Sequence, residues 1–418
     1  MSYPPSYYAT TRHPAPPRPA LAGDATCDVA VIGGGYTGLS AALALAEAGH
    51  DVRLIEAEQV GWGASGRNGG QAIPGLRKGA AELVATFGEA HARALTAVAT
   101  AARDTFWARI AEHGIDCDAR RGHLLAAARP RDLPHFADEA AAHRRLAGEN
   151  RLQLLTAAQV RDHVATDRYH GGLFDPDGGH VHPLNLALGL AAAAERAGAV
   201  LHEGTRALRL DGTTVAAAHG TLRARYVVVA CDGAAGALLP ELAPQVMTVG
   251  NYAVATAPLG PLAAELLPTD AAVADTRFVL DYYRRSADHR LLFAGGERYR
   301  PGAPADIAAF VRPHLERVFP QLAGVGIDYA WGGDVAITRS RYAAVGRRGD
   351  IVWAHGYSGQ GVMLATFMGA LIAETLGGDG ARFDLLSRLP TPAFPGGLAM
   401  RTPLQVAGML YYALRDRL

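Results

Sequence analysis

Short apolar runs alternate with glycine-rich turns and alanine-rich stretches along this 418-residue chain. The run 29–32 is apolar and rich in β-branched residues, which is typical of a buried strand. Residues 39–48, mostly Ala and Leu, predict a helix that follows without a break from a glycine turn. Gly49 ends this helix, because glycine readily adopts the left-handed conformation found past a helix C-terminus. A second strand over 51–55 completes a βαβ unit.

Two more apolar runs lead into turns, 224–230 into the segment 231–234 and 350–354 into the glycine-rich segment 356–361. The Pro-rich arm 3–19 should be extended and lie on the surface. The other predicted elements are a mostly helical stretch over 79–114, a short strand over 123–128 followed by two helices, a helix opened by the segment 180–185 that runs to about 197 and is closed by Gly198, a strand over 199–202, antiparallel strands within 246–300, helices over 305–319 and 362–376, and a docked C-terminal helix within 406–414.

The first glycine turn, GGGYTG at 33–38, fits the pattern G-x-G-x-x-G. In such a turn Gly33 permits the tight bend, Gly35 lets a pyrophosphate approach the backbone, and Gly38 allows close packing of helix and strand. Glu56 follows Gly38 by 18 residues, near the spacing of roughly 20 for a carboxylate that binds the adenosine ribose hydroxyls. The strand–turn–helix–strand–acid order predicts a dinucleotide site, with a purely structural turn as the alternative.

A second glycine-rich stretch, GWGASGRNGGQ at 61–71, follows a few residues later. A nicotinamide enzyme has no evident use for it, whereas a flavin ring is wide and flat and needs small residues where the backbone approaches it. Arg67 and Asn68 could hydrogen-bond the phosphates or the edge of the ring. The stretch therefore favours a flavin, and a flexible surface loop is the alternative.

The third glycine turn, 356–361, precedes a predicted helix. A flavin that accepts a hydride develops negative charge over its N1 and C2 carbonyl region. Unpaired N–H groups and the macrodipole at a helix N-terminus would stabilise that charge. This role is assigned to Gly356, Ser358, Gly359, Gln360 and Gly361, and an ordinary strand–helix turn is the alternative.

The composition of the chain bears on its binding partners and on its cellular compartment. The chain has 40 basic and 40 acidic residues and a formal net charge of zero, which argues against nucleic acid or an anionic membrane as its main partner. The three cysteines, Cys27, Cys117 and Cys231, lie far apart, so neither a disulfide framework nor a metal site is predicted and a reducing cytoplasm is favoured. We expect no membrane span, because no stretch reaches ~18 apolar residues free of charge.

Several segments together resemble the γ-glutamylputrescine oxidase-like branch of the D-amino-acid oxidase/sarcosine oxidase family of FAD enzymes, over nearly the whole chain. The resemblance implies FAD and the oxidation of an amine to an imine, then to an aldehyde, with molecular oxygen reduced to hydrogen peroxide. No histidine or cysteine can be assigned to covalent attachment, so we expect non-covalent FAD. The segments are DVAVIGGGYTGLSAA, GWGASGRNGGQ, GHVHPLNLALGLA, LDYYRRSADHRLLFAGGERY and DVAITRSRYAAVGRRGDIVWAHGYSGQGV.

The resemblance also implies cofactor contacts, position by position. Gln360 departs from the branch, which commonly has histidine there, and glutamine does not titrate, so a proton role at this position is in doubt. The implied FAD-contacting residues are Gly33, Gly35, Tyr36, Thr37, Gly38, Glu56, Ala57, Gly63, Ala64, Ser65, Arg67, Asn68, Gly69, Gly70, Ala207, Gly233, Gly356, Tyr357, Ser358, Gly359, Gln360, Gly361 and Val362.

The substrate side offers fewer signals, because hydride transfer from a neutral amine needs orientation more than acid–base groups. The catalytic candidates are Tyr283, Arg284, His182 and Gln360. Strand alternation puts Tyr282 and Arg284 on one face and Tyr283 on the other. Core packing is the alternative for Tyr283, and capping of a helix start is the favoured alternative for His182.

The predicted fold class is α/β, with a Rossmann-like FAD-binding domain and an inserted antiparallel-sheet substrate domain. Alternatives within the function are an FAD-dependent amino-acid oxidase or dehydrogenase with another electron acceptor, and a non-catalytic flavin-binding subunit. The predicted division is 25–78, 170–240 and 328–390 for FAD, 79–169 and 241–327 for substrate, an N-terminal arm over 1–24 and a C-terminal helical tail over 391–418.

Overall fold

A largely parallel sheet is the first of two sheets in the computed structural model, which describes residues 2–297 and 302–396 together with Met400, Pro403 and Val406. Its strands are β1 (Ala25–Ile32), β2 (Val52–Ile55), β7 (Val200–His202), β8 (Ala207–Asp211), β9 (Thr214–Ala217), β10 (Gly220–Val229), β16 (Ala344–Arg348) and β17 (Ile351–His355). They follow the order β16-β17-β10-β1-β2-β7, and the strands from β17 to β7 are parallel to their neighbours. A hairpin of β8 and β9 extends β10.

The central strand β1 is buried on both faces, as its apolar run predicts. Val29 and Val31 belong to the core formed with the helices of one face, whereas Ala30 and Ile32 belong to a separate core on the other. This alternation follows from the period of two in a strand. The helices of the first core are α2 (Tyr36–Glu47), α7 (Pro183–Arg196) and α10 (Gly361–Leu376). The βαβ prediction over 29–55 is therefore confirmed.

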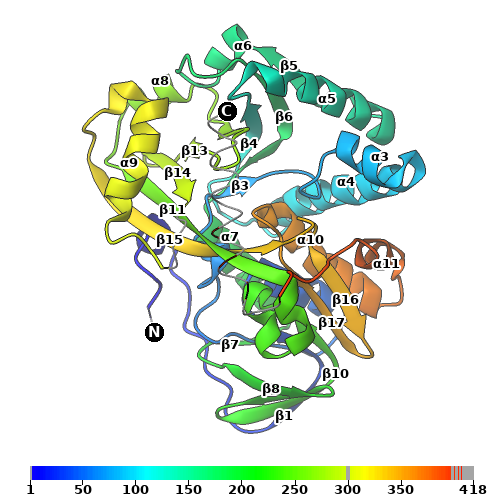
Figure 1. Ribbon diagram of the computed structural model, residues 1–418. Coiled ribbons are helices and arrows are strands. Elements are labelled where there is room, and N and C mark those ends of the chain that lie inside the picture. The colour runs from blue at the N-terminus through cyan, green and yellow to red at the C-terminus, as the bar shows by residue number, and fades with distance from the viewer. Residues whose placement is uncertain (1, 298–301, 397–399, 401–402, 404–405, 407–418) are drawn as a thin grey trace.

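The second sheet is mainly antiparallel and lies above the first in Figure 1. Its strands are β3 (Gln71–Ala72), β4 (Arg120–Ala126), β5 (Gln153–Thr156), β6 (Gly171–His180), β11 (Val246–Thr256), β12 (Ala272–Asp275), β13 (Tyr282–Arg285), β14 (Leu291–Glu297) and β15 (Ile327–Thr338). The order is β15-β11-β14-β13-β12-β4-β6-β3, with β5 on β6, and only the pairing of β12 with β4 is parallel among these described strands. The antiparallel strands predicted within 246–300 are confirmed.

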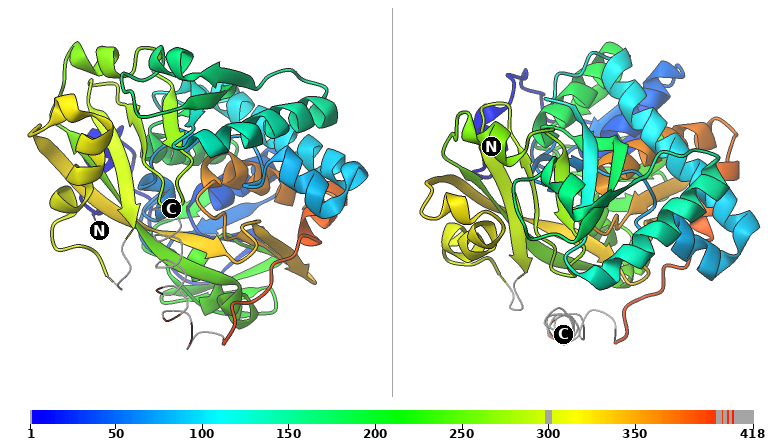
Figure 2. Two further views of the ribbon diagram at one scale, coloured as in Figure 1. Left: turned by 45° about the horizontal axis from the view of Figure 1, so that its top comes forward. Right: turned by 90° about the horizontal axis from the view of Figure 1, so that it is seen from above.

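Most of the remaining helices flank the second sheet, whereas α11 packs against β16 of the first sheet and α1 against α7. Figures 1 and 2 show α9 on one side and the group of α3, α4 and α5 on the other. Among the described residues, no helix has both the length and the apolarity needed to cross a bilayer. These helices are α1 (Tyr7–Thr11), α3 (Ala80–Phe87), α4 (Glu89–Glu112), α5 (Leu133–Ala147), α6 (Ala157–Arg161), α8 (Leu262–Leu266), α9 (Ile307–Val318) and α11 (Ala381–Ser387), with short 3₁₀ turns η1 (Ala64–Gly66), η2 (Pro130–Asp132), η3 (Asp232–Ala237), η4 (Pro240–Gln245) and η5 (Pro320–Leu322).

The mostly helical stretch predicted over 79–114 is confirmed as two helices, α3 and α4, which are separated at Gly88, where φ is +77°. Two strands were not predicted. The ten-residue strand β6 was not predicted, since its sequence GGLFDPDGGH is rich in residues that disfavour strands. The twelve-residue strand β15 was also missed. Both strands are stabilised by long-range pairing, which a single-segment pattern does not contain.

The N-terminal arm is an extended surface segment only in part. Residues 12–17 are exposed and form neither helix nor strand, as predicted, whereas residues 7–11 form α1 and Tyr7 and Tyr8 are buried. The Tyr7 hydroxyl donates to Asp288, and the buried Arg18 guanidinium pairs with Glu195. The two ends of the arm are therefore docked on the core. The predicted helix over 406–414 lies outside the described residues apart from Val406, and the division into domains stays a prediction.

Candidate functional site

A cavity of about 1820 Å³ lies at the carboxyl ends of the central parallel strands and is lined by residues of both sheets. Ligands of open α/β sheets bind in this position, in the crevice outside the strand ends. Glu56, directly after β2, lines one end of the cavity. Tyr282 on β13 and His123 on β4 line the cavity from the second sheet. The site is therefore assembled from segments that are far apart in the sequence.

Glycine is required at two positions of the first turn. Gly33 has a φ of +113°, and a Cβ placed on it would lie 2.6 Å from the carbonyl oxygen of Ala230. A Cβ on Gly38 would lie only 1.9 Å from the carbonyl oxygen of Gly33. Both distances are below 3.0 Å, a separation that real Cβ atoms essentially never show. The turn therefore has the tight bend and the close helix–strand packing that the motif predicts.

The N-terminus of α2 opens onto the cavity beside a carboxylate. Gly35 is the N-cap and has no side chain to occupy the space, and the N–H of Tyr36 donates to Ser65 Oγ over 3.0 Å. The Glu56 carboxylate accepts hydrogen bonds from the N–H groups of Gly34, at 2.7 Å, and Glu58, at 2.9 Å. Burial raises the pKa of Glu56. Its backbone donors fix the carboxylate at the end of β2, where a ribose would be bound.

The second glycine stretch is a defined loop held by its own polar groups. The Asn68 amide donates to the carbonyl oxygens of Ala64 and Ser65 at 3.0 Å, and its oxygen accepts from the N–H of Gly70. A Cβ on Gly69 would lie 2.2 Å from the ring of Tyr282, so this glycine lets the loop pack against β13. The alternative of a flexible surface loop does not describe this stretch.

The third glycine turn begins α10 with a strained backbone. Gly356, Ser358 and Gly359 have φ values of +73°, +54° and +87°. Of these three residues only Ser358 is strained, because a residue with a side chain adopts the left-handed region at a cost in free energy. Gln360 stands at the N-cap, but its side chain accepts no hydrogen bond from the helix, and its amide donates to the Pro74 carbonyl at 2.9 Å. The first N–H groups of α10 therefore lie at the wall of the cavity.

A short hydrogen bond joins the first and third turns. The hydroxyls of Thr37 and Tyr357 lie 2.5 Å apart, and both residues are buried. This contact holds the N-termini of α2 and α10 at the same cavity. Two helix N-termini with small residues around them suit a group that carries a diphosphate at one end and a flat, electron-accepting ring at the other. The residues present therefore fit FAD.

The predicted cofactor contacts divide into those that line the cavity and those behind it. Gly38, Gly70 and Gly356 lie behind the lining, where they set the shape of their turns. The residues in the lining are Gly33, Gly35, Tyr36, Thr37, Glu56, Ala57, Gly63, Ala64, Ser65, Arg67, Asn68, Gly69, Ala207, Gly233, Tyr357, Ser358, Gly359, Gln360, Gly361 and Val362.

The structure brings one of the four catalytic candidates, Gln360, to the cavity. Tyr283 points into the core of the second sheet, stacks on Phe293 at 5.5 Å between ring centroids, and donates to the hydroxyl of Tyr169 at 3.0 Å. Its neighbour Tyr282 lines the cavity instead and donates to Asn251 at 2.6 Å. Period-two alternation separates the two tyrosines as predicted, but the cavity lies on the side of Tyr282.

Arg284 and His182 have structural partners outside the cavity lining. Arg284 is buried and donates through Nε to the carbonyl of Gly69 at 2.9 Å. His182 is the N-cap of α7, and its Nδ1 accepts from the N–H of Asn185 at 3.1 Å. Burial, followed by the charge of Arg284, lowers the pKa of His182 to about 3. The geometry thus agrees with helix capping for His182 and gives neither residue access to a ligand.

Other residues of the lining were not predicted. His123 on β4 lies 3.3 Å from Gln71 through Nε2, and burial lowers its pKa to about 4, so the ring is neutral at pH 7. Arg77 and Arg341 lie on loops beside the third turn. The sequence has no motif around these residues, because pairing and loop packing between distant segments bring them to the cavity.

The fold and the site define a flavin-dependent oxidoreductase, with a βαβ cradle at one end of a cavity and a second sheet over the other. The family described as FAD dependent oxidoreductase (DAO) matches residues 28–375. The chain therefore belongs to the DAO family of FAD-dependent oxidoreductases, and the resemblance drawn from its sequence is confirmed.

Full-length relatives include curated proteins of two bacteria. A γ-glutamylputrescine oxidoreductase of Escherichia coli is 42% identical over 99% of this chain and 98% of the relative. A probable oxidoreductase of Rhizobium meliloti is 39% identical over 99% of this chain and 97% of the relative. A glycine oxidase from Bacillus cereus has the same fold, with a TM-score of 0.70, 21% identity, and coverage of 88% of this chain and 99% of its own.

Proposed function

We propose that this protein oxidises the C–N bond of an amine such as γ-glutamylputrescine and passes the electrons to oxygen. The observation that carries the proposal is a cavity of about 1820 Å³ that is lined both by the βαβ cradle at Glu56 and, beyond Tyr282 and Gln360, by polar side chains such as His123. The cradle suits the cofactor, and the polar side chains suit a substrate. The identity of 42% with a γ-glutamylputrescine oxidoreductase over nearly the whole chain supports this substrate class.

Each wall of the cavity has a role in this proposal. Glu56 binds the ribose hydroxyls, the N-terminus of α2 binds the diphosphate, and the N-terminus of α10 stabilises negative charge on the ring. Tyr282 and Gln360 orient the amine by hydrogen bonds, with hydroxyl and amide groups that keep their charge state at neutral pH. FAD, bound without a covalent link, supplies the acceptor for the hydride.

The proposed reaction balances with water and oxygen as co-reactants. The amine loses two electrons and two protons and becomes an imine. Water then adds to the imine and releases an aldehyde and ammonia. Oxygen takes up the two electrons and two protons and becomes hydrogen peroxide. A cytoplasmic location, favoured by the three scattered cysteines, stays a prediction.

The test is an anaerobic panel of amines and amino acids, read by bleaching of the flavin in the purified holoenzyme. Bleaching by γ-glutamylputrescine, followed in air by release of peroxide without any added dye, supports the proposal. Bleaching without peroxide would favour a dehydrogenase with another acceptor, and bleaching by amino acids alone would favour an amino-acid oxidase. A flavin that no compound reduces would contradict the proposal and favour a non-catalytic flavin-binding subunit.

A further inference from the structure

Arg77 lies at the tip of a tight turn that faces the cavity. Leu76 and Lys78 form an isolated antiparallel bridge, which places Arg77 at the turn between them. Its side chain is exposed to the cavity. Its Nε donates to the carbonyl oxygen of Ser358 at 3.1 Å, next to the start of α10. One edge of the guanidinium is thus fixed against the third glycine turn.

The charge of Arg77 is not neutralised by the protein. Among the described residues, no carboxylate lies within 4.0 Å of its guanidinium, and surrounding protein followed by the charge of Arg341 lowers its pKa. Two other cations of the lining have acids: Arg151 pairs with Asp175 at 2.6 Å, and Lys78 pairs with Glu82. A guanidinium that is open to the cavity and has another guanidinium nearby favours an anion, because charge-assisted hydrogen bonds to a carboxylate are stronger than neutral ones.

Backbone strain supports a role for this turn. Arg77 and Arg341 have φ values of +73° and +71°, and both line the cavity together with Ser358 at +54°. A non-glycine residue in this region costs of the order of 1–3 kcal/mol and persists where the surrounding structure fixes it. Glycine at either position would avoid this cost. Both positions instead have arginine, so the strained backbone carries a guanidinium side chain that glycine would lack.

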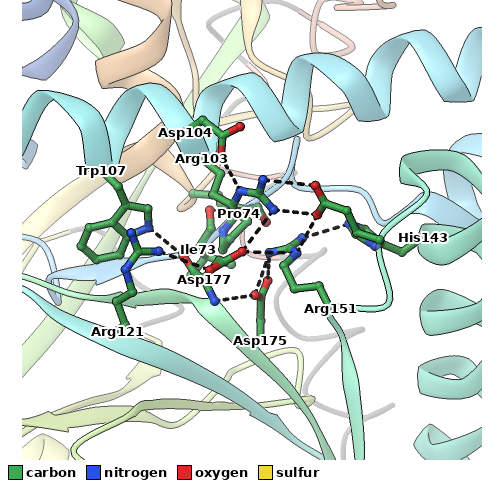
Figure 3. A network of polar contacts seen from close by, with 12 residues as sticks. Ile73, Pro74, Arg103, Asp104, Trp107, Arg121, His143, Arg151, Asp175 and Asp177 are labelled. Carbon is green, nitrogen blue, oxygen red and sulfur yellow. Dashed lines mark hydrogen bonds and ion pairs between the residues drawn. The ribbon is translucent and has the colours of Figure 1, made fainter.

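The turn is also held in place from behind. The Gln360 amide donates to Pro74, and a Cβ on Gly178 of β6 would lie 3.4 Å from Pro74 Cδ. Beside Gly178, β6 takes part in a network of ion pairs that joins it to α4 and to the segment before β5 (Figure 3). The network consists of Arg103, Glu149, Arg151, Asp175 and Asp177, with His143 beside Arg151. The position of Arg77 is therefore set by rigid elements.

We propose that Arg77, with Arg341 beside it, binds a carboxylate at the end of the substrate remote from the reacting amine. This inference rests on the proposed function and adds to it a residue that selects among amine substrates. At neutral pH a free diamine would bring a second ammonium group towards the two guanidinium groups and be repelled. A diamine conjugated through an amide to a carboxylate-bearing acid has lost that ammonium and gained an anion, which the planar guanidinium can bind with two hydrogen bonds.

The experiment compares γ-glutamylputrescine with N-acetylputrescine, which has the same reacting amine and amide but lacks both the carboxylate and the α-ammonium group of the glutamyl end. In the holoenzyme we expect Arg77→Gln to lower kcat/KM for γ-glutamylputrescine by ~10- to 100-fold, the size of a charged hydrogen bond. The loss should fall mainly on KM, because the carboxylate is bound equally before and during the reaction. For N-acetylputrescine the change should stay within ~3-fold, since no pair is lost.

Three further variants complete the test. Arg77→Lys keeps the charge without the fork and should restore part of the loss, and Arg341→Gln should change selectivity in the same direction. Arg223→Gln, which removes an exposed arginine paired with Asp24 on the outer part of β10, is the matched control and should change neither substrate. If Arg77→Gln does not retain FAD, the two amines are compared in Arg77→Lys and Arg341→Gln instead.

The outcomes separate this inference from the proposed function. Equal kcat/KM for the two amines in the unaltered enzyme would overturn the carboxylate site while amine oxidation stands. Equal losses for both amines in Arg77→Gln, together with a changed flavin reduction potential, would show that Arg77 acts on the flavin and would also overturn it. Failure of both amines to bleach the flavin of the unaltered enzyme would contradict the proposed function itself.

Discussion

The two ends of the cavity are built in different ways. At the end near Glu56, main-chain N–H groups and glycines shape the wall, and a Cβ on Gly33 or Gly38 would collide with backbone. At the other end the wall consists of long side chains, including Arg77, Arg341 and His123, carried by loops and by the second sheet. At Gly33 and Gly38 the backbone wall tolerates no added atom, whereas side chains of the other wall can be exchanged without moving the chain. We infer that the first end fixes the cofactor and the second determines the substrate.

The largest effect should come from Gly38→Ala. The new Cβ would lie 1.9 Å from a carbonyl oxygen, so either α2 or β1 must move, and we expect a destabilisation above ~4 kcal/mol with loss of bound flavin. Thermal unfolding and the yellow colour of the purified protein measure this. Gly380→Ala is the control, because a Cβ on Gly380 would meet no atom closer than 3.8 Å and this glycine lies outside the cavity lining, so neither the unfolding midpoint nor the bound flavin should change. Equal behaviour of the two variants would contradict the contrast between the ends.

A smaller effect should separate Glu56 from Gln360. Glu56→Ala removes a charged acceptor for the ribose, and we expect the dissociation constant of FAD to rise by ~10- to 100-fold. Gln360→Ala, whose amide bonds to Pro74, should change FAD binding by less than ~3-fold. Reconstitution of the apoprotein, followed by flavin fluorescence, measures both constants. Equal retention in the two variants would count against the ribose assignment.

The neighbouring tyrosines offer a matched pair. Tyr282→Phe removes a hydroxyl from the cavity wall and should lower kcat/KM for amine oxidation about tenfold. Tyr283→Phe removes a hydroxyl that donates to Tyr169, and should cost about 1 kcal/mol of stability with kcat/KM nearly unchanged. Steady-state kinetics and denaturant unfolding measure the two effects. The opposite pattern would show that the catalytic face is that of Tyr283.

The smallest effect concerns pH and His182. Its pKa is about 3 in the folded protein against 6.5 for a free histidine, so the unfolded chain binds the additional proton as the pH falls below 6.5. The free energy of unfolding should therefore fall with decreasing pH, by on the order of 1 kcal/mol over the first unit. His182→Asn keeps a good helix cap and should reduce this slope while amine oxidation continues. If His182→Asn instead loses activity while the slope of unfolding free energy against pH is unchanged, His182 is again a catalytic candidate.

The cofactor end was predictable because its signals are local. The turn at 33–38, the helix after it and Glu56 follow one another within a single βαβ unit, and the geometry depends on steric rules for glycine. For the tyrosine pair, alternation assigned the two faces, but both faces of β13 are covered, so the pattern could not tell which face meets the cavity. Strand β6, which carries part of the far wall, has a composition that does not predict a strand.

Arg77 had no signal of any kind in the sequence. Its left-handed φ, its bond to Ser358 and its position opposite Arg341 arise from three segments that meet only in the folded chain. The same holds for His123, which reaches the cavity because β4 pairs with β6. Residues that determine a substrate are drawn from such segments, and their role becomes visible only when the fold is known.

The buried tyrosines of the N-terminal arm have a consequence for how the chain is made. Tyr7 bonds to Asp288, which is 281 residues further along, and Tyr8 contacts Arg284. The arm leaves the ribosome long before its partners on β13 and the turn after it are synthesised. Its two tyrosines must therefore stay undocked through most of synthesis, and the core around them closes late. An N-terminal fusion would act on this last folding step, and we expect it to slow the recovery of the native protein without altering the cavity.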